Sequence, residues 1–99
     1  MSWRVRYTRA AREDLLRLYA FLLESDISAA EHALDTIEKS VELLRSFPFS
    51  CRKPDLDNPF LREMLVSFGA AGYVALYEIE DDRTVTILAL RRQREDDFR

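Results

Sequence analysis

Three alternating segments near the C-terminal end of the chain constrain the fold more than any other feature. They span residues 61–68, 73–79 and 84–90, and each is rich in β-branched and aromatic residues. The breaks between them, 69–72 and 80–83, hold glycine or aspartate and are short. Segments joined by such short turns pair antiparallel, so we expect a β-meander in this part of the chain.

The last of these segments is apolar on both sides, which predicts a central position in the sheet. Strict alternation predicts that Val85, Ile87 and Ala89 share one face, and that Leu88 and Leu90 lie on the other.

A fourth strand is expected at the start of the chain. Trp3, Val5 and Tyr7 alternate with basic or polar residues over positions 3–8, which indicates a strand with one buried face. Because this strand returns to the meander only after an intervening helical region, we expect it to pair at an edge of the sheet.

Two helices follow the first strand. Residues 9–24 have a helical period, with Thr8 as the expected N-cap. The second helix is expected to begin at the capping box formed by Ser28 and Glu31, and to end before Pro48. A connection of about three residues makes the two helices an antiparallel hairpin.

The first helix carries two neighbouring apolar stripes. One contains Ala11, Leu15, Leu18 and Leu22, and the second contains Leu16, Tyr19 and Leu23. Together they are wider than one sheet face requires. Either the helix is deeply buried, which is the more common situation, or the second stripe is left for a partner.

These elements predict an α+β fold with the order β-α-α-β-β-β. The helical hairpin packs on one face of a twisted, four-stranded antiparallel sheet. With 99 residues, of which 47% are hydrophobic, the chain suits a single domain over residues 1–99 with one core.

Composition excludes several classes of protein. No run of about 18 apolar residues is present, so we expect no membrane partner. The single cysteine, Cys51, allows no intrachain disulfide and fits a cytoplasmic location. A formal net charge of -3 disfavours a general nucleic-acid binder.

Few side chains suggest metal or acid–base chemistry. His32 is the only histidine and has no cysteine or second histidine near it in sequence, so we expect no metal site. Catalysis by His32 is a minor alternative to a helix-surface position. The irregular segment 47–60 contains Cys51 without a Cys-His motif, and we expect Phe47, Phe49 and Phe60 to attach this segment to the core.

The candidate binding residues are the arginines on the meander and just past it: Arg62, Arg91, Arg92 and Arg94. Guanidinium groups pair with phosphate or carboxylate through two parallel hydrogen bonds. Two interpretations remain open for each of them. Arg62 either pairs with a carboxylate such as that of Glu78 or binds a target, and the other three are either solvated charges or a patch that recruits an acidic partner.

In this order and spacing the chain resembles the RelE/ParE superfamily of toxins from bacterial type II toxin–antitoxin systems. The resemblance covers nearly the whole length. Its landmarks are T-R-A-A-R-E-D-L at 8–15, Pro48, R-E-M-L-V at 62–66, Y-V-A-L-Y at 73–77 and I-L-A-L-R-R-Q-R-E-D at 87–96.

The resemblance implies one of two activities, and no cofactor or metal. RelE-like members are ribosome-dependent mRNA endonucleases that use basic residues of the sheet and commonly a tyrosine near the C-terminus. ParE-like members lack the nuclease residues and poison DNA gyrase, causing growth arrest. Both kinds are neutralised by a cognate antitoxin, for which Leu16, Tyr19 and Leu23 are the candidate docking residues here; an added antitoxin strand at the sheet edge is a further possibility.

The residues favour the ParE-like activity. Arg62 and Arg92 resemble the basic sheet residues of the family, but Phe98 stands where the tyrosine is expected and cannot transfer a proton. Family members often carry a histidine where Arg92 stands. The alternatives are a RelE-like endonuclease acting on the ribosome and mRNA, and a degenerate member that binds only its antitoxin.

Overall fold

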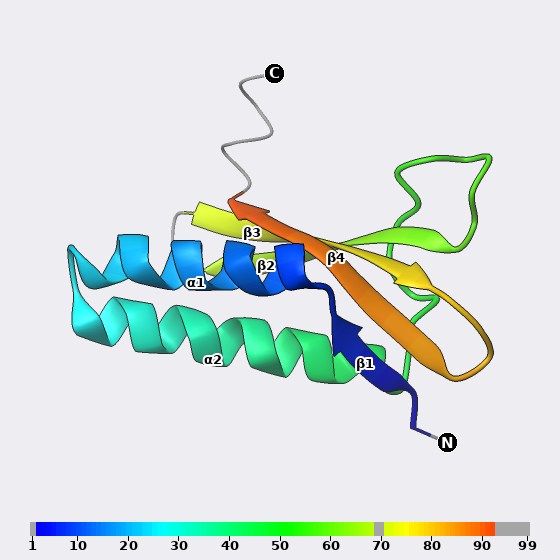
Figure 1. Cartoon of the computed structure of the whole chain (residues 1–99), viewed down its shortest axis with the longest axis horizontal. Coiled ribbons are helices and arrows are strands. Elements are labelled where there is room, and N and C mark those ends of the chain that lie inside the picture. Colours follow the sequence, from blue (N-terminus) through cyan, green and yellow to red (C-terminus); the bar gives the residue numbers. More distant parts are fainter. Residues whose placement is uncertain (1, 69–70, 93–99) are drawn as a thin grey trace.

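The computed structural model describes residues 2–68 and 71–92. Along the chain the elements are β1 (Arg4–Tyr7), α1 (Arg9–Leu23), α2 (Ile27–Leu44), β2 (Leu61–Phe68), β3 (Ala71–Ile79) and β4 (Thr84–Arg92). Helices α1 and α2 lie side by side on one side of the four-stranded sheet (Figure 1). The predicted α+β class and the predicted order of elements are therefore confirmed.

The sheet is mixed, and the expectation of an all-antiparallel sheet was wrong. The strand order is β1-β4-β3-β2, with β2–β3 and β3–β4 antiparallel. Strand β1 pairs with β4 in parallel, with Val5 opposite Val85. Alternation in β1 reports which residues are buried but carries no information on the direction of the neighbouring strand. The central place of β4 and the edge place of β1 are confirmed.

Each helix begins at a side chain that accepts hydrogen bonds from the first turn. The Thr8 hydroxyl accepts from the amide of Ala11 at 3.0 Å, as expected. The N-cap of helix α2 is Asp26 and not Ser28, which the predicted capping box would require. The Asp26 carboxylate accepts hydrogen bonds from the amides of Ser28 and Ala29 at 2.9 and 3.3 Å. A carboxylate at this position also interacts favourably with the positive end of the helix dipole, which the Ser28 hydroxyl cannot do.

The core lies between the helical hairpin and the sheet. Tyr73, Tyr77, Leu44, Ile87, Leu90 and Val85 are its largest fully buried side chains. Ala11 and Leu18 of α1 and Ile37 of α2 pack against them. The burial of these side chains on folding is the main term that stabilises the arrangement.

The segment between α2 and β2 is attached to the sheet by hydrogen bonds more than by its phenylalanines. Phe47, Phe49 and Phe60 are 63%, 49% and 51% exposed, so the expectation that these three side chains attach the segment to the core was wrong. Instead, the buried hydroxyl of Tyr77 donates to the Pro48 carbonyl at 2.6 Å. Arg62 supplies the other attachment, which is described below.

Candidate functional site

A β-bulge in β4 decides which way the arginines at its end point. Leu76 of β3 lies opposite Ala89, and the next residue, Tyr77, lies opposite Ile87, so Leu88 is the extra residue. A bulge of this kind reverses the alternation of the strand beyond it. Leu90 is accordingly fully buried, whereas Ala89 is partly exposed, so the expectation that Ala89 shares a face with Val85 and Ile87 was wrong.

Two consecutive arginines therefore lie on opposite sides of the sheet. Arg92 lies opposite Tyr73, on the side that the helices cover, and its guanidinium carbon is 4.5 Å from the centroid of the Phe21 ring on α1. Arg91 lies opposite Val74 and is exposed, on the side turned away from the helices, which we call the outer face. Arg94, the remaining candidate of this group, lies outside the described residues.

The backbone at the bulge is tied to the start of α1. The Thr8 amide donates to the Ile87 carbonyl at 3.0 Å, and the Thr8 hydroxyl donates to the Leu88 carbonyl at 3.3 Å. The Leu90 amide donates to the Asp14 carboxylate at 3.0 Å. The N-cap Thr8 and Asp14 of α1 thus supply partners for backbone groups of β4 that the bulge would otherwise leave without them.

Arg62 is an internal residue of the fold. Its side chain is buried at 9% exposure and donates to the carbonyls of Pro59, Phe49 and Cys51 at 2.7, 2.8 and 2.9 Å. The guanidinium carbon also lies 5.3 Å from the centroid of the Phe49 ring. Arg62 thus meets backbone carbonyls of the preceding segment and not, as one interpretation proposed, the Glu78 carboxylate.

Tyr73 and Tyr77 are buried in the sheet, whereas Tyr7 of β1 is half-buried, with a pKa that partial burial also raises. Burial raises the pKa of Tyr73, an effect that the nearby Arg92 charge partly offsets. Burial likewise raises the pKa of Tyr77 strongly, and contact with Cys51 adds to this increase. Phenols with raised pKa values do not act as general bases near neutral pH. His32 is exposed on α2.

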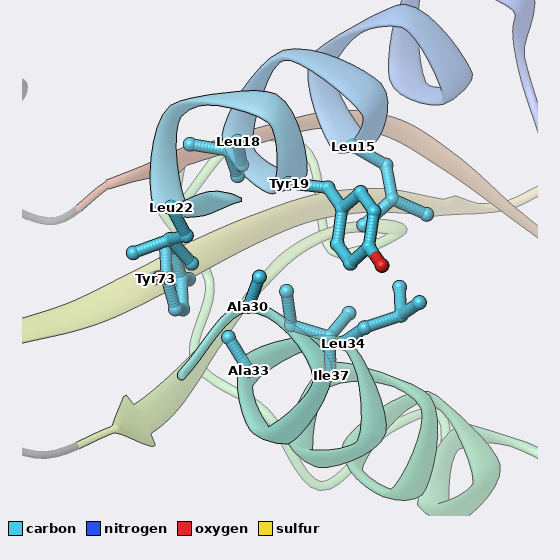
Figure 2. A pocket seen from close by; sticks show the side chains of 9 residues that line it. All are labelled: Leu15, Leu18, Tyr19, Leu22, Ala30, Ala33, Leu34, Ile37 and Tyr73. Carbon is cyan, nitrogen blue, oxygen red and sulfur yellow. The ribbon is translucent and has the colours of Figure 1, made fainter. Parts of the chain in front are cut away.

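The candidate docking stripe of α1 differs in exposure along its length. Leu16 is 67% exposed and Leu23 is 38% exposed. Tyr19 is half-buried and turns toward Leu34 of α2, at the apolar depression between the two helices (Figure 2). Leu15, Leu18, Leu22, Ala30, Ala33, Ile37 and Tyr73 line the rest of this depression.

Within residues 2–68 and 71–92, no group of three or more His, Cys, Asp or Glu side chains is placed to hold a metal ion. In the same part of the chain no helix has both the length and the apolar composition needed to cross a membrane.

The sequence that forms this fold is that of a toxin of the RelE/ParE superfamily. More closely, the chain belongs to the family of ParE toxins of type II toxin–antitoxin systems, whose family model matches residues 5–97. The chain is also similar to Toxin RelE3 of Caulobacter vibrioides, with 39% identity over 75 residues that cover 76% of this chain and 78% of that protein.

Two solved structures share the fold. A chain of the chromosomal ParDE toxin–antitoxin system from P. aeruginosa matches with a TM-score of 0.69 and 19% identity, over 92% of this chain and 96% of that one. A chain of the RelBE2 toxin–antitoxin complex from Mycobacterium tuberculosis matches with a TM-score of 0.61 and 24% identity, over 94% and 100%. The family model and the similarity to Toxin RelE3 show that the protein is a type II toxin of this superfamily, and the two solved structures show the fold that it shares with them.

Proposed function

We propose that this toxin is a ParE-like inhibitor of DNA gyrase that acts in the cytoplasm and is neutralised by a cognate antitoxin. Membership of the ParE family supports the proposal. The observation that carries it is the arrangement of Arg62 and Arg92, the two residues that a RelE-like site would use on the scissile phosphate.

Arg62 and Arg92 are not placed to act on one phosphate. Arg62 lies opposite Tyr77 and Arg92 lies opposite Tyr73, four positions apart along β3, which corresponds to about 13 Å. Three of the five N–H donors of Arg62 are bonded to backbone carbonyls of the fold, and Arg92 stacks on Phe21. Cleavage by attack of a ribose 2′-hydroxyl also needs a proton acceptor, and the buried Tyr73 and Tyr77 do not supply one.

The second candidate function is a RelE-like, ribosome-dependent mRNA endonuclease. The similarity to Toxin RelE3 favours it. In that case Arg91 on the outer face would contact the RNA. A second residue, which the described residues do not identify, would act as the general base. The gyrase and ribosome activities are separable with purified components.

The proposed partner in the inactive state is an antitoxin, since both neighbouring structures come from toxin–antitoxin systems. Leu16, Tyr19 and Leu23 are the proposed docking residues, and the exposure of Leu16 leaves apolar surface for a partner to cover. An amphipathic antitoxin segment laid along α1 would bury it.

The proposal predicts that Arg91→Ala combined with Arg92→Ala abolishes inhibition of gyrase supercoiling while antitoxin binding is retained. We expect this because the two positive charges at the end of β4, Arg91 on the outer face and Arg92 beside Phe21, would attract the gyrase–DNA complex. Neither arginine is one of the candidate docking residues. Inhibition is measured with purified gyrase and relaxed plasmid, and antitoxin binding is measured by calorimetry.

The matched control is Arg9→Ala with Arg12→Ala, which removes the same charge from two exposed positions on α1. The control is expected to inhibit like the unmodified toxin. Full inhibition by the Arg91, Arg92 double variant would contradict the assignment of these residues.

A further inference from the structure

A second candidate binding site lies at the end of the molecule away from the α1–α2 turn. There the N-terminal residues, the 47–60 segment and the β3–β4 turn come together (Figure 1). They enclose a cavity of about 440 Å³, within the size range of ligand sites in proteins. Its lining residues are Trp3, Phe49, Phe60, Ile79, Glu80, Asp81 and Asp82.

The apolar wall of this cavity is aromatic and is held in place from behind. Trp3 and Phe49 meet edge to face with their centroids 6.0 Å apart. The Trp3 amide donates to the Arg45 carbonyl at 2.7 Å, and the Phe60 carbonyl accepts from the Ile79 amide at 2.8 Å. About half of the Phe49 and Phe60 surface nevertheless stays exposed, so aromatic surface is available to a ligand without rearrangement of the backbone.

The β3–β4 turn adds three acidic residues to the lining, and two of their carboxylates have partners. Glu80 accepts a hydrogen bond from Thr86 and lies 3.8 Å from the Arg6 guanidinium. Asp81 accepts from the amides of Arg83 and Thr84, both at 2.8 Å, and these bonds lower the pKa of its carboxyl. Within residues 2–68 and 71–92, Asp82 makes no hydrogen bond or ion pair, so its charge is available to a ligand.

We propose that this cavity binds an arginine side chain of a partner polypeptide. The aromatic rings would stack on the guanidinium and on its aliphatic stem, and the Asp82 carboxylate would accept its hydrogen bonds. An anionic side chain would be repelled by the three carboxylates, and an apolar one would leave the Asp82 charge beside it without compensation. Arginine fits better than lysine because its planar group both stacks and pairs with a carboxylate through two hydrogen bonds.

This inference goes beyond the proposed function and does not depend on it. The cavity is separate from the docking stripe of α1 and from the arginines at the end of β4, so it adds a contact whichever target the toxin has. Its volume also leaves room for the peptide backbone on either side of an arginine.

Trp3 provides a direct test, because it is the only tryptophan of the chain. The purified toxin is titrated with acetyl-Gly-Arg-Gly-amide and with the same peptide carrying citrulline, which has nearly the same shape but no charge. Binding is followed by the emission of Trp3 and by the NMR signal of its indole N–H. We expect saturable changes with the arginine peptide and about tenfold weaker binding of the citrulline peptide.

Two variants separate the two walls of the site. Asp82→Asn removes the charge, Phe60→Leu removes a ring but keeps apolar volume, and each is expected to weaken binding of the arginine peptide about tenfold. Glu31→Gln, the same loss of charge at an exposed position of α2, is the matched control and is expected to bind normally. Circular dichroism checks that all three variants are folded.

The proposal is overturned if the arginine peptide gives no saturable change at millimolar concentration. It is overturned equally if the citrulline peptide binds as tightly as the arginine peptide, or if Asp82→Asn leaves binding unchanged. This experiment contains neither gyrase nor ribosomes. A negative result would therefore not contradict the proposed function, and a failure of the proposed function would not change the binding result.

Discussion

At the scale of single residues, Arg62 shows how one side chain organises an irregular segment. Its guanidinium donates to carbonyls of Phe49, Cys51 and Pro59, which lie at both ends of the segment before β2. Hydrogen bonds from a charged, buried donor stabilise a fold more than neutral ones do, and their removal leaves the carbonyls without partners. We therefore expect Arg62 to matter for the stability of the folded toxin.

Arg62→Met tests this role. The variant keeps apolar volume but loses all three hydrogen bonds, so we expect the free energy of unfolding to fall by about 3 kcal/mol. Urea denaturation followed by circular dichroism measures the change. Arg17→Met is the control, because Arg17 is exposed and its ion pair is with Asp14 on the same helix, and it should cost well under about 1 kcal/mol. A stable Arg62→Met variant that has lost toxicity would instead show that Arg62 binds the target.

At the scale of elements, the β4 bulge and helix α1 form one unit. The bulge at Leu88 turns Leu90 into the core and Arg92 toward Phe21, and the Asp14 carboxylate accepts from the Leu90 amide directly beyond it. A helix side chain thus fixes the place where the strand changes its alternation.

Asp14→Ala removes this connection. We expect it to lower the free energy of unfolding by about 2 kcal/mol, because the Leu90 amide loses its partner in a buried position. Glu13→Ala, at the neighbouring exposed position, is the control and should cost only a few tenths of a kcal/mol. Equal stability of the two variants in urea would show that the bulge does not need Asp14.

The candidate docking surface for the antitoxin is likewise a feature of one element, helix α1. Leu16→Glu with Leu23→Glu is expected to weaken antitoxin binding at least about tenfold, because two leucines would lose their apolar contact and two charges would be buried. Calorimetry with the cognate antitoxin measures this, and the isolated variant should remain toxic. If the variant binds its antitoxin normally, the docking surface lies elsewhere.

These elements also show what could be predicted from the sequence. The strands, the helical hairpin and the N-cap at Thr8 follow from local periodicity and side-chain chemistry. The parallel pairing of β1, the bulge at Leu88 and the carbonyl partners of Arg62 depend on residues distant in sequence, which a local pattern does not report. The acidic and aromatic cavity around Trp3 was missed for the same reason, although the exposed Asp82 within a turn was a weak signal.

At the scale of the whole molecule, the helices cover one side of the sheet. The candidate arginines that the structure describes lie on both sides of this sheet. Arg62 and Arg92 contact groups of the fold itself, whereas Arg91 faces outward. Tyr73 and Tyr77 are buried inside the core, and the half-buried Tyr7 packs against it. This distribution suits a protein that binds a large partner better than one that cleaves RNA.

The most direct test of this account is made with the purified toxin and two targets side by side. One reaction holds gyrase, supercoiled plasmid and ATP and is assayed for covalent gyrase–DNA complexes, and the other holds translating ribosomes and is assayed for cut mRNA. The account predicts that gyrase–DNA complexes accumulate while the mRNA remains intact, and that the Arg91, Arg92 double variant yields neither product. Cut mRNA in the ribosome reaction, with no effect on gyrase, would contradict it.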